Sequence, residues 1–260
     1  MKHIEIETTK PLVSIIVPCY NAEKFVAQTL DCLVKQQLQD IEIIVVNDGS
    51  TDNSKAIIEK FFFDRRIRYI EKDNGGTGSA LNLGHSIARG KYLTWCSADN
   101  IYFENFALTL LQGLIMAEQQ NVHYIYSDFI FVNEGGQRMR DVIHANPQPP
   151  HDLVNGYDLG MSFMYTKELW DKVGEYKSGI CEDYDWSVRA AEYTSFALIR
   201  QVLAAFRVHS KQISGNRKEE ELEAANACKA LAAQMIADGK YDATLVEVSA
   251  GFNPRLVENA

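Results

Sequence analysis

Polar side chains stand directly after three apolar runs of this sequence. The first run is followed by Pro18, Tyr20 and Asn21, the second by Asp48, and a later one by Asp99. A tyrosine in such a place can stack on a base, and an aspartate can accept hydrogen bonds from a base or ribose or hold a divalent cation. Ligands of open parallel sheets bind beyond the carboxyl ends of the strands. Three such endings therefore favour a nucleotide site, although each one alone also suits a turn or a helix cap.

The elements that would position these residues alternate regularly over the first hundred residues. Apolar runs predict four strands, at residues 12–17, 41–46, 67–70 and 92–96, and the first two are expected to be buried. Helical spacing of apolar residues predicts a helix in each of the three intervals between them. Asn21 is expected to cap the first helix and Gly90 to follow the end of the third. This alternation is typical of a mostly parallel sheet covered by helices.

The second half of the sequence is less regular. Its patterns predict a helix at 108–117, a strand at 123–127 and a hairpin through 129–137. An irregular loop at 144–156 is expected next, followed by a strand at 161–165 and helices at 167–173 and 183–192. Residues 218–238 carry apolar side chains at helical spacing. This last helix is expected to pack on the body of the protein or on another subunit, which would make a homo-oligomer.

Composition excludes several classes of protein. The 260 residues carry 26 Lys+Arg against 35 Asp+Glu, a net charge of −9, which argues against a nucleic-acid partner or a polybasic membrane patch. The five cysteines are scattered and are expected to be reduced thiols. The first ten residues show no apolar signal segment, and no apolar run approaches the roughly 20 residues of a membrane-spanning helix. We therefore expect a cytoplasmic protein.

Four segments resemble glycosyltransferase family 2, in the family's order and spacing: residues 13–23, 45–54, 90–100 and 181–189. The resemblance covers about residues 10–215. It implies an α/β protein with the GT-A fold, a Rossmann-like and mostly parallel sheet sandwiched by helices, with a C-terminal helical tail. The implied organisation is an N-terminal extension (1–10), a GT-A domain (11–215) with a nucleotide-sugar-binding half (11–100) and an acceptor half (101–215), and the tail (216–260).

The same resemblance implies an inverting, metal-dependent transfer of a sugar from a nucleotide diphospho-sugar, carrying UDP or dTDP, to a hydroxyl acceptor. The acceptor would be a carbohydrate or a lipid-linked molecule of polysaccharide, cell-wall or glycolipid synthesis, reached in the latter case by peripheral contact with the membrane. The donor would be bound by residues at the strand ends, namely Pro18, Tyr20, Asn21, Asp48 and Ala98.

The resemblance also assigns the metal ligands and the base. Asp99 would ligate Mg²⁺ or Mn²⁺, which bridges the donor diphosphate, and His209 would approach the metal or the diphosphate. Asp183 would be the general base, with Glu182 as the second candidate. Asp185, which is two residues further along the same predicted helix, has the simpler explanation of a first-turn acid favoured by the helix dipole.

Three other functions are alternatives to this interpretation. A non-catalytic relative would bind a nucleotide sugar without transferring it, and Ala98 favours that alternative because the family's paired acidic segment is reduced there. A nucleotidyltransferase would need a basic, glycine-rich loop after the first strand. Residues 18–23, which follow that strand here, do not form such a loop. A dinucleotide-binding dehydrogenase would have a glycine fingerprint at the same place, and this sequence lacks it.

Overall fold

The computed structural model describes residues 10–142, 153, 159–177, 179–212, 218–241 and 245–248. The predicted extension at 1–10 and the predicted irregular loop at 144–156 lie outside these residues except for Lys10 and Leu153.

Four parallel strands form the half of the sheet that the sequence predicts. They are β1 (Val13–Cys19), β2 (Ile41–Asp48), β3 (Ile67–Lys72) and β4 (Tyr92–Trp95), which lie side by side in the order β4-β1-β2-β3. Each is close to its predicted position, and β2 continues two residues further, to Asp48. Because the strands are parallel and β1 lies between β4 and β2, the segments that follow these three strands meet at one edge.

The other half of the sheet continues from β4 through β8 (Phe163–Thr166), β6 (Tyr124–Val132), β9 (Phe196–Arg207) and β10 (Leu245–Glu247). The strand β8 is antiparallel to both neighbours, whereas β6, β9 and β10 are parallel to one another. The predicted hairpin forms between β6 and β7 (Arg138–Val142), and a short β5 (Ile101–Tyr102) pairs with β9. The sequence analysis did not identify β5, β9 or β10.

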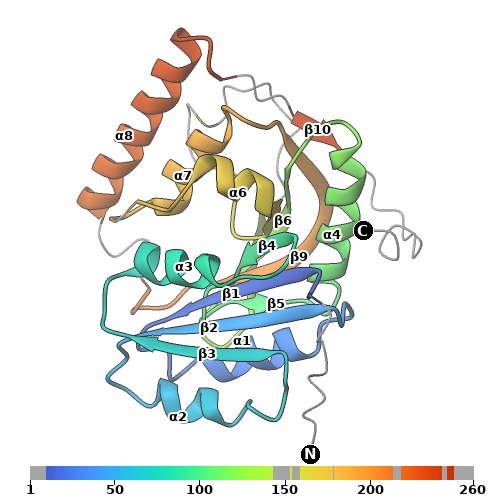
Figure 1. Ribbon diagram of the computed structural model, residues 1–260. Coiled ribbons are helices and arrows are strands. Elements are labelled where there is room, and N and C mark those ends of the chain that lie inside the picture. Colours follow the sequence, from blue (N-terminus) through green and yellow to red (C-terminus); the bar gives the residue numbers. More distant parts are fainter. Residues whose placement is uncertain are drawn as a thin grey trace, which may run out of the picture.

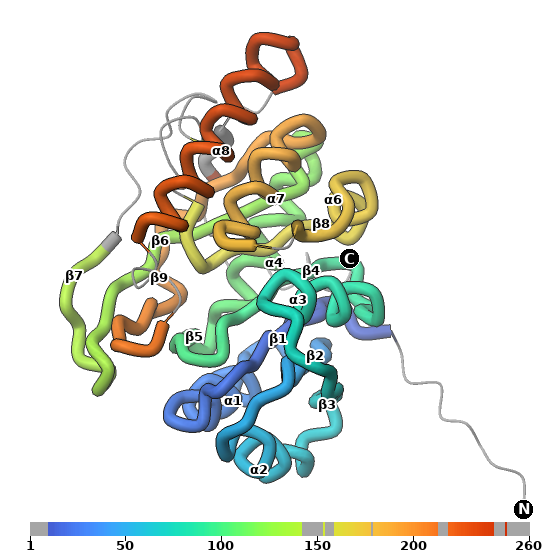
Figure 2. The backbone as a smooth tube through the Cα atoms, turned by 90° about the vertical axis from the view of Figure 1, so that its left-hand side faces the viewer, coloured from blue at the N-terminus to red at the C-terminus, as the bar shows by residue number. Residues whose placement is uncertain are grey.

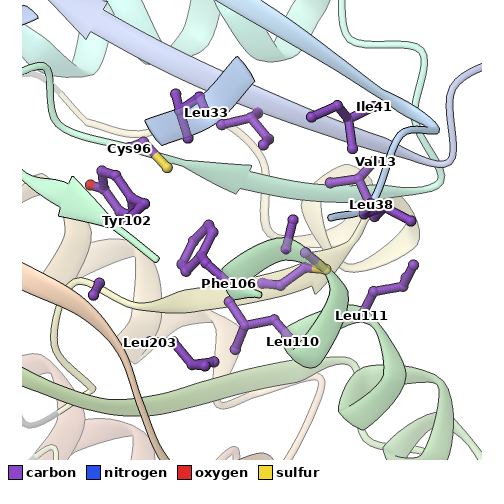
Figure 3. Packing of buried hydrophobic residues seen from close by; sticks show 14 of the residues in the cluster. Val13, Leu33, Leu38, Ile41, Cys96, Tyr102, Phe106, Leu110, Leu111 and Leu203 are labelled. Carbon is purple, nitrogen blue, oxygen red and sulfur yellow. The ribbon is translucent and has the colours of Figure 1, made fainter. Parts of the chain in front are cut away.

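Helices cover both faces of the sheet (Figure 1). One face packs against α1 (Val26–Val34), α2 (Ser54–Glu59) and α4 (Phe106–Glu118). The other packs against α3 (Thr77–Ser86), α6 (Lys167–Val173), α7 (Glu182–Ala190) and α8 (Lys218–Ala237). Alternate residues of a strand point to opposite faces, so Ile15 belongs to the first apolar cluster and Ile16 to the second. Figure 3 shows part of the first cluster, where Phe106 and Leu110 of α4 pack among apolar side chains of the sheet and of α1.

Two local predictions are wrong. Asn21 does not cap the first helix, because α1 begins at Val26 and Phe25 is its N-cap residue. Gly90 does not end α3, whose C-cap is Ile87. The glycine is needed for a close backbone approach instead, since a Cβ at position 90 would lie 2.6 Å from the main-chain nitrogen of Ser14.

The long helix α8 lies against α7, as Figure 2 shows. Its side chains Cys228, Ala232 and Met235 are buried in the second apolar cluster. Packing on the body of the same chain is thus one of the two arrangements expected for this helix, and a homo-oligomer stays a prediction. No helix in the described part of the chain is long and apolar enough to cross a membrane.

Candidate functional site

The segments after β1 and β2 are joined by hydrogen bonds at the sheet edge. The main-chain nitrogen of Asn21 donates to Ser50 Oγ (3.1 Å), and Asn21 Oδ1 accepts from the nitrogen of Thr51 (2.8 Å). One residue on, the nitrogen of Ala22 donates to Ser54 Oγ (2.9 Å). Asn21 adopts a left-handed backbone conformation (φ 49°), which asparagine tolerates better than most residues. Its side chain therefore shapes this edge by holding the neighbouring loop.

Two other predicted donor-binding residues flank this junction. Pro18 lies within β1 opposite Val46 of β2 and is partly buried. Tyr20, just beyond the end of the strand, is 53% exposed although it is a large apolar side chain. An exposed aromatic ring beside a parallel sheet edge is free to stack on a flat ligand such as a nucleobase.

Asp48 is buried and holds the loop that follows β3. Its Oδ1 accepts from Lys72 Nζ (2.6 Å) and from the nitrogen of Gly75 (3.0 Å), and its Oδ2 accepts from the nitrogen of Gly76 (2.8 Å). The side chain of Asn74 donates to the main-chain oxygen of Asp48 (3.0 Å). Both carboxylate oxygens are therefore engaged within the protein. Contact of Asp48 with a donor stays a prediction, and in this arrangement the residue positions the glycine loop.

Ala98 and Asp99 point in different directions. The Ala98 side chain is buried in the first apolar cluster, which also contains Tyr102 and Phe106, so only its main chain can face a ligand. Asp99 keeps 30% of its side chain exposed. An acidic side chain at position 98 would lie in the apolar core, where an unpaired charge is very costly. The Ala98 side chain therefore belongs to the core rather than to the exposed edge. The non-catalytic relative stays an alternative.

His209 lies next to Asp99 although the two are 110 residues apart in the sequence. The distance from His209 Nε2 to Asp99 Oδ2 is 3.1 Å, and the imidazole ring lies 4.5 Å from the ring of Phe25, centroid to centroid. The nitrogen of Lys211 donates to His209 Nδ1 (3.3 Å), so the neutral ring carries its proton on Nε2 and donates it to Asp99. The fold thus brings together the two residues for which the sequence suggests metal binding.

The chemistry of this pair suits a divalent cation. A carboxylate oxygen and an imidazole nitrogen are both ligands of Mn²⁺, and Mg²⁺ and Mn²⁺ sites commonly take their remaining ligands from substrate phosphates and water. Binding at His209 Nε2 requires the other tautomer, in which Nδ1 carries the proton. In the described part of the chain no group of three or more His, Cys, Asp or Glu could hold a metal, so the protein would supply at most this pair from such side chains.

Glu182 and Asp183 form an acidic pair at the start of α7. Burial, together with the negative charge of Asp183, raises the pKa of Glu182 to about 7. Burial also raises the pKa of Asp183, against the opposing effect of the hydrogen bond that its Oδ1 accepts from the nitrogen of Tyr184 (2.8 Å). No lysine or arginine pairs with either carboxylate in the described residues. A poorly solvated, unpaired carboxylate is a stronger base than an exposed one, as proton abstraction requires.

Asp185 has a different environment from its two acidic neighbours. Its carboxylate accepts from Lys177 Nζ (2.8 Å) and from Arg189 Nε (2.8 Å). Both of its oxygens are therefore used in ion pairs, one with the segment before α7 and one within the helix. The structure supports the structural explanation of this residue and leaves Asp183 and Glu182 as the candidates for the base.

The segment before α7 connects the acidic pair to the first half of the sheet. Asn82 of α3 exchanges two hydrogen bonds of 2.9 Å with the main chain of Tyr176. Gly78 lies so close to this segment that a Cβ there would be 2.8 Å from the oxygen of Lys177. Burial raises the pKa of Tyr176, with a contribution from the charge of Asp183. The acidic pair is thus anchored to the helix that directly follows the glycine loop held by Asp48.

Arg207 is a residue for which the sequence indicated no role. In the structure it is a buried guanidinium whose Nε donates to the main-chain oxygen of Asp99 (2.8 Å). The available signal was an arginine at the end of a mostly apolar stretch, two residues before His209. What the sequence could not indicate is which carbonyl it reaches.

Comparison with known proteins agrees with this geometry. A family model described as "Glycosyl transferase family 2" matches residues 14–178. An uncharacterized glycosyltransferase of Rickettsia felis is 30% identical over 222 residues, 81% of this chain and 37% of the relative. The uncharacterized glycosyltransferase EpsJ of Bacillus subtilis is 50% identical over 201 residues, 72% of this chain and 55% of EpsJ. The chain thus spans about a third to a half of the length of these relatives.

Solved structures share the fold at low sequence identity. S. aureus TarS 1-349 in complex with UDP-GlcNAc has a TM-score of 0.65 and 20% identity, covering 77% of this chain and 59% of that one. The mannosyltransferase PcManGT from Pyrobaculum calidifontis, in complex with GDP-Man and Mn²⁺, has a TM-score of 0.60 and 17% identity, covering 97% and 79%. With the GT-A architecture, and with a family match over most of the sheet, the chain belongs to glycosyl transferase family 2.

Proposed function

We propose that this chain transfers a sugar from a nucleotide diphospho-sugar to a hydroxyl acceptor with inversion at the anomeric carbon. The observation that carries the proposal is the approach of Asp99 and His209 to 3.1 Å, beside strand ends that suit a nucleotide. UDP-GlcNAc and GDP-Man in the fold neighbours support a nucleotide-sugar donor. The donor nucleotide proposed here is UDP or dTDP.

Each half of the predicted GT-A domain has a part in the proposed reaction. In the donor half (11–100), Tyr20 would stack on the base, and Asn21 and Asp48 would hold the loops around it. A Mg²⁺ or Mn²⁺ ion held by Asp99 and His209 would supply positive charge for the departing nucleoside diphosphate. The supporting observation is the oxygen and nitrogen donor pair on this edge, together with the Mn²⁺ of PcManGT.

In the acceptor half (101–215), Asp183 would remove the proton from the acceptor hydroxyl. The hydroxyl oxygen then forms a bond to the anomeric carbon while the bond from that carbon to the diphosphate oxygen breaks, which inverts the configuration. Glu182 is the second candidate for the base. The acceptor proposed is a carbohydrate or a lipid-linked molecule of polysaccharide, cell-wall or glycolipid synthesis, the latter met at the membrane surface.

A panel of UDP-, dTDP- and GDP-sugars tests donor binding through the thermal unfolding midpoint, with and without Mn²⁺. We expect UDP- or dTDP-sugars to raise the midpoint more strongly with Mn²⁺ than without it. Asp99→Ala should lose the Mn²⁺-dependent part, whereas Asp183→Asn should keep it. Asp185→Asn, two residues further along α7 and ion-paired, is the matched control. No shift with any nucleotide sugar in either condition would refute the proposal.

A further inference from the structure

Arg207 joins three separate segments beside Asp99. It is the last residue of β9 and is 2% exposed. Its Nε donates to the oxygen of Asp99 (2.8 Å), one terminal nitrogen to the oxygen of Glu134 (2.7 Å), and the other to Gln28 Oε1 (2.6 Å). A single side chain thus connects α1, the turn between β6 and β7, and the segment after β4.

Further hydrogen bonds, from the main chain of Arg207 and from α1, hold the residue that follows Asp99. The nitrogen of Arg207 donates to Asn100 Oδ1 (2.9 Å), and the oxygen of Asn100 accepts from Thr29 Oγ1 of α1 (2.7 Å). The ring of Phe25 lies near two side chains, with the Arg207 guanidinium carbon 5.1 Å and the His209 ring 4.5 Å from its centroid. One aromatic ring therefore packs on the arginine and on the histidine that faces Asp99.

Burying this guanidinium is expensive for the protein. Its side chain donates to three neutral oxygens, and no carboxylate forms an ion pair with it in the described residues. Burial lowers the pKa of Arg207, while the negative charge of Asp99 opposes that effect. A buried charge satisfied only by neutral acceptors adds little to stability compared with an apolar side chain of similar volume. Its main contribution is therefore to fix the positions of the three groups that accept its hydrogen bonds.

We infer that Arg207 is a positioning residue for the cation site: it fixes the main chain of Asp99 so that the carboxylate stays opposite His209. The inference rests on the proposed function, because it presupposes a divalent cation at this pair. Groups that orient metal ligands without touching the metal typically change metal affinity about 10- to 100-fold when they are replaced. The planar fork of arginine, which reaches three acceptors at once, cannot be reproduced by lysine.

Mn²⁺ affinity, measured on the full chain with UDP by the loss of the electron paramagnetic resonance signal of free Mn²⁺, tests the inference without turnover. Arg207→Met should weaken Mn²⁺ binding about 10- to 100-fold. Arg207→Lys keeps the charge and loses the fork, and we expect it to resemble Arg207→Met. Gln28 is exposed, so Gln28→Ala should not prevent folding. It should weaken Mn²⁺ binding about 2- to 10-fold, the effect of one hydrogen bond.

Arg66 provides the matched control. Its side chain also makes three kinds of contact, to Asp64, to Gln39 Oε1 and to the oxygen of Val34, but it lies just before β3, at the opposite end of the parallel strands. Arg66→Met should lower the unfolding midpoint and leave Mn²⁺ affinity unchanged. Wild-type affinity in folded Arg207→Met, or in Arg207→Lys and Gln28→Ala if the methionine variant does not fold, would overturn the inference alone. A wild-type chain that binds no Mn²⁺ with UDP would overturn the metal part of the proposed function as well.

Discussion

Replacing Glu182 by glutamine tests whether the acidic pair of α7 is held at a cost to stability. Burial and the charge of Asp183 raise the pKa of Glu182 from its usual 4.5 to about 7. The folded protein therefore keeps a proton that the unfolded chain releases at lower pH. The stability that this proton provides is fully present below about pH 4.5 and is lost as the pH rises through about 7.

The size of the effect follows from the two pKa values. Their difference corresponds to about 3 kcal/mol at most, and to less in so far as the partly exposed carboxylate is solvated. Glutamine cannot ionise, so the variant should escape this loss. At pH 8 we expect Glu182→Gln to be more stable than the wild type by about 1–3 kcal/mol, with a difference that disappears near pH 4.5.

Urea unfolding of both proteins in steps between pH 4.5 and pH 8.5 measures this difference. Asp185→Asn is the control on the same helix, and it should be less stable than the wild type at pH 7 because it leaves Lys177 and Arg189 without their partner. Parallel stability profiles for the wild type and Glu182→Gln would refute the reasoning. They would mean that the Glu182 carboxylate is solvated and that its pKa is not raised by burial.

Two further substitutions test how the edge of the sheet is built. Asp48→Asn should lower the free energy of unfolding by about 1–3 kcal/mol, because Lys72 loses its charged partner and the glycine loop loses acceptors; an unchanged urea midpoint would contradict this role. Gly90→Ala should cost about 1–3 kcal/mol, because its Cβ would lie 2.6 Å from the main chain of Ser14, which cannot rotate away as a side chain would. Thermal unfolding measures that cost, and a variant as stable as the wild type would show that the backbone can yield.

The first half of the fold could be predicted because its strands are short, largely apolar runs that alternate with helical patterns and are followed by polar residues. For the same reason the sequence indicated which residues would lie at the sheet edge. The strand β9 could not be found in this way, because Arg200 and Gln201 interrupt its apolar pattern and its pairing with β6 shifts register near Asp128. Its place in the sheet depends on a partner strand that is distant in the sequence.

In the candidate site, too, the sequence indicated some of the residues but not the contacts that hold them. The resemblance suggested both Asp99 and His209, and the fold brings them together. The hydrogen bonds that engage Asp48 come from residues 72–76, which are adjacent only because β2 and β3 pair in parallel. The contacts of Arg207 likewise link residues 73 to 179 positions apart. Such contacts are set by tertiary packing, and neither residue type nor spacing indicates them.

Release of nucleoside diphosphate from a UDP- or dTDP-sugar, in the presence of Mn²⁺, tests the central claim most directly. The account predicts release by the wild type and by Asp185→Asn. It predicts a loss of about 100- to 10,000-fold for Asp183→Asn with donor binding intact, the usual contribution of a general base. Release by Asp183→Asn at the wild-type rate, or no release by the wild type from any sugar nucleotide with a range of hydroxyl acceptors, would contradict it.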